Sequence, residues 1–131
     1  METIKLYRIA EKNGITVDRF SLPANSSVSL KIGGSLFVGM DNDIEGAAEK
    51  VCLAHELGHC ITFSFYNYYS KLDVREKHER KANLWAIQTL VPEKKFKAAL
   101  KNGYDNVYSL AEYFGVTADF MKKAVNYYKG A

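Results

Sequence analysis

The sequence predicts an α+β fold in which a small antiparallel sheet, over about residues 15–40, packs on several helices. Two observations predict this class. Short segments in which β-branched and polar residues alternate occur between residues 15 and 40. From residue 43 onward, the segments have the apolar spacing or the terminating residues of helices. With 131 residues, of which 47% are hydrophobic, the chain is expected to form one domain over residues 1–131.

The first part of the chain is expected to supply one helix and the whole sheet. Residues 2–13 are predicted to form a short helix that ends at Gly14, a residue suited to a helix C-terminus. A strand follows over residues 15–22, where apolar and polar residues alternate. Residues 28–32 and 35–40 flank two consecutive glycines, a pattern typical of a two-residue hairpin turn.

The next two helices are predicted from their ends. One helix, capped by Asp43 or a near neighbour, is expected to run to about Tyr66. A second begins at Asp73, with Glu76 three residues later in a capping-box-like arrangement. This helix ends before Pro92, which itself suits the first turn of a third helix.

The C-terminal segment, residues 104–128, is expected to form two short helices broken at Gly115, similar to a helix-turn-helix unit. One interpretation is a DNA-reading element whose Lys122 and Lys123 contact phosphates. The other is a pair of packed helices, or a docking surface for a protein. The second helix carries Asp119 and few residues suited to base edges, and the net charge is only +3. We therefore do not expect direct nucleic-acid binding.

Cysteine usage and hydropathy predict a soluble cytoplasmic protein without a membrane partner. Cys52 and Cys60 lie eight residues apart on one predicted helix, which separates their Cα atoms by about 12 Å. This separation is too large for a disulfide. The N-terminal segment lacks the apolar core of a signal peptide, and no apolar run approaches membrane-spanning length.

The pentapeptide HELGH is the most specific motif in the chain. On a helical wheel, His55 and His59 lie about 40° apart, whereas Leu53 and Leu57 lie on the opposite side. Two imidazoles one turn apart can reach a single zinc ion at about 2.0–2.1 Å. Gly58 is expected to leave room for a metal and its substrate. The segregated faces favour a metal site over a chance pattern on a core helix.

A catalytic zinc site uses three protein ligands and one open position. Glu56 projects about 100° from His55, so we expect it to act as general base and not as a ligand. The next helix offers Glu76, His78 and Glu79 as the third ligand. Glu76 and Glu79 share one face, and His78 points about 100° away from Glu79. Spacing alone does not choose between the two glutamates, although Glu76 also fits the capping role.

The segment AHELGH, followed by E-R-K-A-N-x-W-A-x-x-x-L-V-P over residues 79–92, resembles the ImmA/IrrE family of zinc metallopeptidases. The resemblance runs from about Ile15 to the C-terminus and is specific at residues 54–59 and 79–92. It implies a metallopeptidase-like domain with a zincin-like helical core. It also implies one Zn²⁺ per chain, with Glu79 as the third ligand beside the two histidines.

The resemblance further implies a zinc-dependent endopeptidase that acts on a protein. Members of the family occur in phages, other mobile elements and bacterial stress-response loci, where they cleave a helix-turn-helix transcriptional repressor encoded beside them. Many members are longer than this chain, with an additional C-terminal region. The alternative function is a non-catalytic anti-repressor or DNA-binding regulator, in which the zinc site is a relic or is structural.

Three further residues are candidates for supporting roles at the site. Asn83 is expected to accept a hydrogen bond from a ligating histidine. His78 and the aromatic run 65–69, which includes Tyr66, are candidates for binding substrate or donating to an oxyanion; ordinary packing is the alternative for both. A peptide substrate is expected to bind as an added strand at the edge of the hairpin 28–40.

Overall fold

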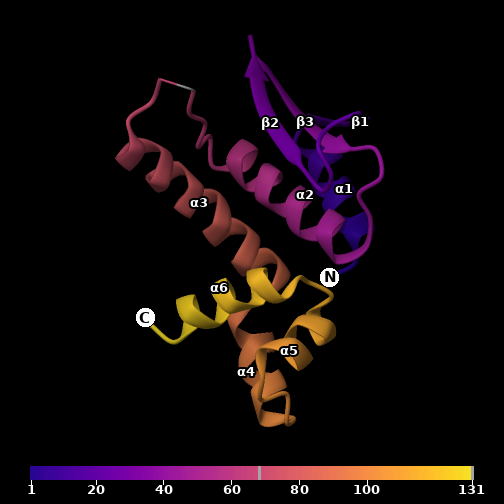
Figure 1. Cartoon of the computed structure of the whole chain (residues 1–131), viewed down its shortest axis with the longest axis vertical. Helices are drawn as coiled ribbons and strands as arrows, with labels where there is room; N and C mark the ends of the chain where they lie inside the picture. Colours follow the sequence, from indigo (N-terminus) through magenta and orange to yellow (C-terminus); the bar gives the residue numbers. More distant parts are fainter. Residues whose placement is uncertain (68, 131) are drawn as a thin grey trace.

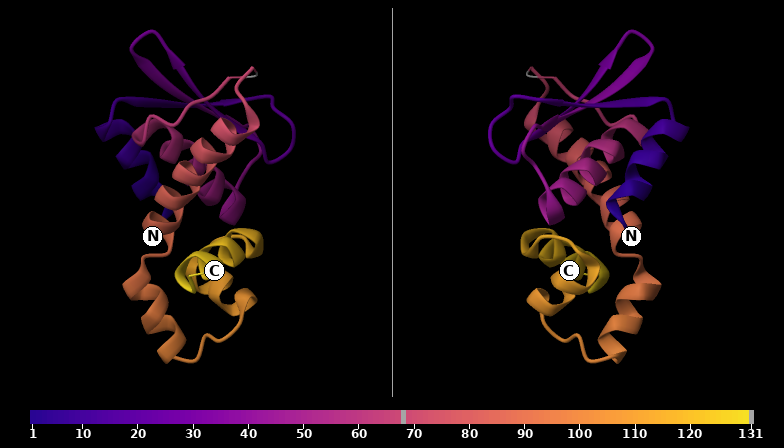
Figure 2. Two further views of the ribbon diagram at one scale, coloured as in Figure 1. Left: turned by 90° about the vertical axis from the view of Figure 1, so that its left-hand side faces the viewer. Right: turned by 90° about the vertical axis from the view of Figure 1, so that its right-hand side faces the viewer.

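The computed structural model describes residues 1–67 and 69–130, and it confirms the predicted α+β class. The sheet lies at one end of the long axis, the last three helices lie at the other end, and two long helices run between them (Figures 1 and 2). The elements in chain order are α1 (Thr3–Lys12), β1 (Ile15–Phe20), β2 (Ser27–Ile32), β3 (Ser35–Asp41), α2 (Gly46–Ile61), α3 (Leu72–Leu90), α4 (Glu93–Lys101), α5 (Val107–Phe114) and α6 (Ala118–Tyr128).

The sheet is mixed, which corrects the prediction of a purely antiparallel one. Its strand order is β1-β3-β2. The predicted hairpin is present: β2 and β3 are antiparallel, Ile32 lies opposite Ser35, and the turn needs Gly33 at a φ of +62°. However, β1 pairs with β3 in parallel. Residues 21–26 carry the chain past the position of β3, so the hairpin returns β3 alongside β1 in the same direction. Alternation of apolar residues is the same in both kinds of pairing and could not distinguish them.

One face of the sheet packs on helices. Val38 and Met40 of β3 and Ile15 of β1 are buried against α1 and α2. Side chains of the opposite face, such as Leu30 and Ile32, are exposed. β2 is an edge strand and contacts α2. The sheet therefore presents a strand edge beside the helix that carries HELGH.

The two long helices, α2 and α3, pack closely at Gly58. A Cβ atom added there would lie 2.5 Å from the carbonyl oxygen of Ala82 and 3.0 Å from its Cα. The expectation that Gly58 leaves room for a metal is therefore wrong: this glycine faces the backbone of α3 and permits the two helices to approach. Ala82 is fully buried at the same contact.

The predicted helix starts were correct to within a few residues, but the predicted caps were not. Glu45 precedes α2 and Lys71 precedes α3, and neither side chain makes a capping hydrogen bond. The end of α2 at Ile61, instead of near Tyr66, has a local cause. Phe63 has a φ of +50°, outside the range of a right-handed helix, so the chain leaves the helix axis there.

The C-terminal helices are joined as predicted, with Gly115 in the left-handed conformation between α5 and α6. Two hydrogen bonds attach them to the long helices. The ammonium group of Lys50, on α2, is buried and donates to the carbonyl of Phe114 at 2.7 Å. The hydroxyl of Tyr128 donates to the carbonyl of Val91. Within residues 1–67 and 69–130, no helix combines the length and the apolar character that crossing a membrane requires.

Replacing Gly58 by alanine should destabilise the protein, because the new methyl group cannot fit against the backbone of Ala82. We expect Gly58→Ala to lower the free energy of unfolding by about 2 kcal/mol in urea titrations, despite the higher helix propensity of alanine. Gly34→Ala is the matched control, because nothing lies within 4 Å of the added Cβ. Equal stability of the two variants would contradict a close contact between α2 and α3.

Candidate metal centre

The two histidines of HELGH converge on one point beside α2. The Nε2 atoms of His55 and His59 lie 3.1 Å apart, because one helical turn separates the residues. The imidazole planes are nearly perpendicular, at 89°. His59 is buried and His55 is half-buried. The pair thus offers two nitrogen atoms at the edge of the core, with one side open.

Glu79 reaches the same point from α3. Its Oε2 lies 3.0 Å from Nε2 of His55, and its Oε1 lies 3.2 Å from Nε2 of His59. Ligands at about 2.0–2.1 Å from a tetrahedral zinc ion would be about 3.3 Å apart, so these three residues fit such an ion. Glu76, the other glutamate on this helix face, is exposed and is not part of the group. The structure thus brings together the three ligands that the resemblance implied.

Hydrogen bonds at Nδ1 fix the tautomers of both histidines. Nδ1 of His59 lies 2.6 Å from the backbone carbonyl oxygen of Ser64, and Nδ1 of His55 lies 2.9 Å from Oδ1 of Asn83. Both partners accept hydrogen bonds only, so each Nδ1 carries the proton. In the neutral form of each ring, Nε2 is then the nitrogen that presents a lone pair toward Glu79. Metal-bound histidines characteristically have this arrangement, in which the outer nitrogen donates to an oxygen.

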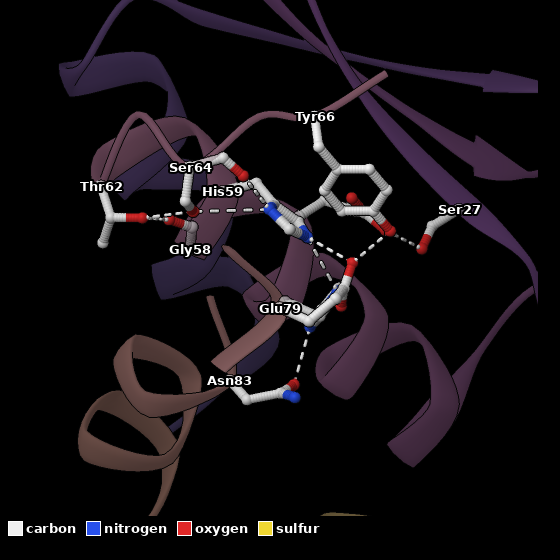
Figure 3. A network of polar contacts seen from close by, with 10 residues as sticks. Ser27, Gly58, His59, Thr62, Ser64, Tyr66, Glu79 and Asn83 are labelled. Carbon is white, nitrogen blue, oxygen red and sulfur yellow. Dashed lines mark hydrogen bonds and ion pairs between the residues drawn. The ribbon is translucent and has the colours of Figure 1, made fainter. Parts of the chain in front are cut away.

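The turn after α2 supplies the partner of His59 (Figure 3). Past Phe63 the chain folds back, so that the backbone N–H of Ser64 donates to the carbonyl of His59 at 2.9 Å. The hydroxyl of Thr62 donates to the carbonyl of Gly58 and lies 2.6 Å from the hydroxyl of Ser64. These contacts hold the Ser64 carbonyl against the imidazole. No sequence pattern points to Ser64, because a backbone carbonyl carries no residue signature.

Glu56 lies on the wall of a cavity of about 320 Å³ that opens beside the two imidazoles. Its side chain is buried, and Oε2 accepts a hydrogen bond of 2.8 Å from the hydroxyl of Ser27 on β2. It is not among the three converging ligand atoms. Ser27 could not be predicted from the sequence, because its position depends on the register of β2 against the helix.

Glu79 is held in its ionised form by its neighbours. Burial alone would raise the pKa of Glu79, but the hydrogen bond from Tyr66, together with the positive charge that the His55 and His59 imidazoles carry when protonated, outweighs this effect and lowers the pKa. The hydroxyl of Tyr66 donates to Oε1 of Glu79 at 2.7 Å, and this bond raises the pKa of the tyrosine. The carboxylate is therefore anionic and oriented before any cation binds.

His78 lies behind Tyr66 and not in the cavity. The two rings stack with centroids 6.5 Å apart and an interplanar angle of 13°. Nδ1 of His78 is buried and has no hydrogen-bond partner among residues 1–67 and 69–130. The packing interpretation therefore fits His78 better than a role at the substrate. Tyr66, in contrast, lines the cavity. Tyr68, another member of the aromatic run, lies outside the described residues.

The comparison with known families decides between a peptidase and an unrelated metal-binding fold. Residues 10–126 match the family described as Peptidase_M78, the IrrE N-terminal-like domain. The chain belongs to this peptidase family. The match covers α2, α3 and all residues of the candidate site, and it confirms the resemblance inferred from AHELGH. No curated protein and no solved structure matches the chain significantly.

The M78 peptidase family and the three-residue group support each other. A peptidase of this kind needs a site that can hold a metal and that is open to a peptide. The group formed by His55, His59 and Glu79 has its ligand atoms within 4.8 Å of one another. The Glu79 side chain is 36% exposed and the His59 side chain only 6%, so the group is open on one side and anchored in the core on the other.

Asn83 should matter for metal affinity although it does not belong to the converging group. Removing its carboxamide in Asn83→Ala leaves Nδ1 of His55 without its acceptor and the ring free to turn. We expect zinc affinity to fall about 10- to 100-fold, measured by competition with a chromophoric chelator. Gln88→Ala, which removes an exposed amide from the same helix, is the control and should bind zinc normally. An unchanged affinity in Asn83→Ala would argue against metal binding through Nε2 of His55.

Proposed function

We propose that this chain is a zinc-dependent endopeptidase that hydrolyses a peptide bond in a protein substrate. One observation carries the proposal: the two histidine Nε2 atoms and the Glu79 carboxylate converge within 3.0–3.2 Å of one another, beside an open cavity. A catalytic zinc site typically has three protein ligands and one open coordination position, whereas a structural zinc site has four protein ligands.

His55, His59 and Glu79 would hold the ion. When bound, zinc would lower the pKa of a water molecule toward about 7 and polarise the carbonyl of the scissile peptide. Glu56 is the residue available for proton transfer, because its carboxylate lines the same cavity without joining the ligands. Ser27 holds one oxygen of Glu56, which leaves the other free to accept a proton and return it to the leaving amine.

The substrate would bind along β2. Residues 27–30 of this strand line the cavity together with Glu56 and both histidines. β2 pairs with β3 on one side only, so its other edge has unpaired backbone groups that an extended peptide can join as an additional strand. Such pairing would hold the peptide backbone alongside the metal ligands and Glu56.

The protein substrate is proposed to be a helix-turn-helix transcriptional repressor encoded near this chain in a phage or other mobile element. This part of the proposal comes from the resemblance to the ImmA/IrrE family at residues 54–59 and 79–92. Cleavage would inactivate the repressor in the cytoplasm. Direct contact with nucleic acid is not part of the proposal, in keeping with the modest net charge of +3.

Glu56→Gln separates catalysis from metal binding. The variant should bind zinc as the wild type does but cleave the neighbouring repressor at least about 100-fold more slowly, because the amide cannot accept the proton. His55→Ala should lose zinc and cleavage together. Glu76→Gln, an exposed glutamate outside the group, is the matched control for the substitution and should retain full activity.

Electrophoresis of the repressor and zinc analysis of each variant provide the measurement. If Glu56→Gln relieves repression as fully as the wild type, the protein acts as a non-catalytic anti-repressor and the proteolytic proposal is wrong. If only chains with an intact Glu56 relieve repression, cleavage is the mechanism.

A further inference from the structure

The cavity beside β2 is only one half of the space around the metal group. A second cavity, of about 350 Å³, extends from the other side. The two cavities share Ser27, His55 and Glu79. From there the second cavity passes Cys52 and Asn83 and reaches the start of α6, where it is lined by Thr117, Asp119, Phe120 and Lys123. The two cavities therefore adjoin at the metal group, one extending toward β2 and the other toward α6, and together they form the candidate substrate cleft.

α6 forms a fixed wall of this cleft. Its first turn is capped by Thr117, whose hydroxyl oxygen accepts from the backbone N–H of Phe120 at 3.2 Å. Phe120 and Met121 are buried in the core. The buried ammonium of Lys50 ties the preceding helix to α2 at 2.7 Å. A side chain on the exposed face of α6 is thus held in a defined position beside the site.

Two charged side chains project from α6 at this wall. Asp119 and Lys123 are one turn apart and both are exposed. Within residues 1–67 and 69–130, neither forms an ion pair. Asp119 lies in the first turn of α6, where the positive end of the helix dipole compensates a carboxylate. Lys123 lies beyond the first turn, so the helix dipole does not offset its positive charge. Its ammonium group is therefore available to bind a negatively charged ligand.

We propose that α6 is the second wall of the substrate cleft and that Lys123 binds an acidic side chain of the protein substrate. This inference rests on the proposed peptidase function and adds a specificity-determining residue to it. The substrate would pair with β2 on one side of the metal group and meet Lys123 on the other. The two C-terminal helices, which resemble a helix-turn-helix unit in sequence, would then bind a protein and not DNA.

Peptide hydroxamates test this contact without requiring hydrolysis, because the hydroxamate chelates the metal and the peptide is not cleaved. Each probe carries a single Glu or Lys in an otherwise neutral peptide, and the position of that residue is scanned on both sides of the hydroxamate. Binding to the zinc-loaded chain is measured by calorimetry. We expect one position at which the Glu probe binds more tightly than the Lys probe by up to about fivefold, the upper end of the range for an exposed ion pair.

Lys123→Glu should reverse this preference at the same position. Lys122→Glu is the matched control: it makes the same change on the neighbouring, exposed residue, which does not line the cavity, and should leave the preference intact. Circular dichroism checks that both variants fold. The inference is overturned if no position prefers Glu, or if Lys122→Glu and Lys123→Glu have the same effect.

The outcome for the peptidase proposal is read separately. If the hydroxamates show the predicted charge preference but the wild type cleaves no peptide or protein, the proposed role of Lys123 in the cleft is supported and the catalytic proposal fails. If the wild type cleaves its substrate but Lys123→Glu changes no affinity, the catalytic proposal stands and the role of Lys123 fails. If no hydroxamate binds the zinc-loaded chain, both proposals fail.

Discussion

The contact between Gly58 of α2 and Ala82 of α3 is the constraint on which the site depends. The two backbones lie so close that a single Cβ atom at Gly58 would be 2.5 Å from the Ala82 carbonyl oxygen. Glu79 lies three residues before Ala82 on α3, nearly one turn away, and His59 follows Gly58 directly. The approach of the helices therefore sets the 3.2 Å separation between the Glu79 carboxylate and the His59 imidazole. A larger residue at Gly58 would separate the helices and move the carboxylate away from both histidines.

Electrostatics at this contact favour a cation. When His55 and His59 are neutral, two imidazole lone pairs and one carboxylate converge, since each ring donates its single N–H to Asn83 or Ser64 on the outer side. Such a group is repulsive unless a positive charge joins it. The hydrogen bond from Tyr66 offsets part of the repulsion at Glu79 and helps to hold its pKa below the usual value. The fold thus orients the ligands before metal binding, which reduces the reorganisation that binding would require.

Sequence periodicity was sufficient for the parts of the site that lie on one helix. The 40° separation of His55 and His59 follows from helix geometry alone, and the structure has the two nitrogens 3.1 Å apart. Helix geometry does not choose between Glu79 and Glu76 as the third ligand, because the spacing permits both. The resemblance to the family indicates Glu79. What determines the choice physically is the rotation of α3 against α2, a tertiary property that neither helix specifies alone.

Other features of the fold and the site could not be predicted from the sequence, because they also depend on tertiary structure. The parallel pairing of β1 with β3 depends on the path of residues 21–26, since alternation is the same in parallel and antiparallel strands. Ser27 meets Glu56 through the register of β2, and the Ser64 carbonyl meets His59 through the turn at Phe63. Gly58 was correctly recognised as a position that must stay small, but the neighbour that requires it is a helix backbone and not a metal.

X-ray absorption at the zinc edge, on the protein loaded with one equivalent of zinc, tests whether His55, His59 and Glu79 form an open three-ligand site. We expect only nitrogen and oxygen scatterers at about 2.0–2.1 Å, with imidazole scattering from two histidines and a fourth ligand from solvent. The His59→Ala variant should show one imidazole fewer. A sulfur scatterer at about 2.3 Å, which Cys52 at the wall of the second cavity could provide, or four protein ligands in the wild type, would contradict an open catalytic site.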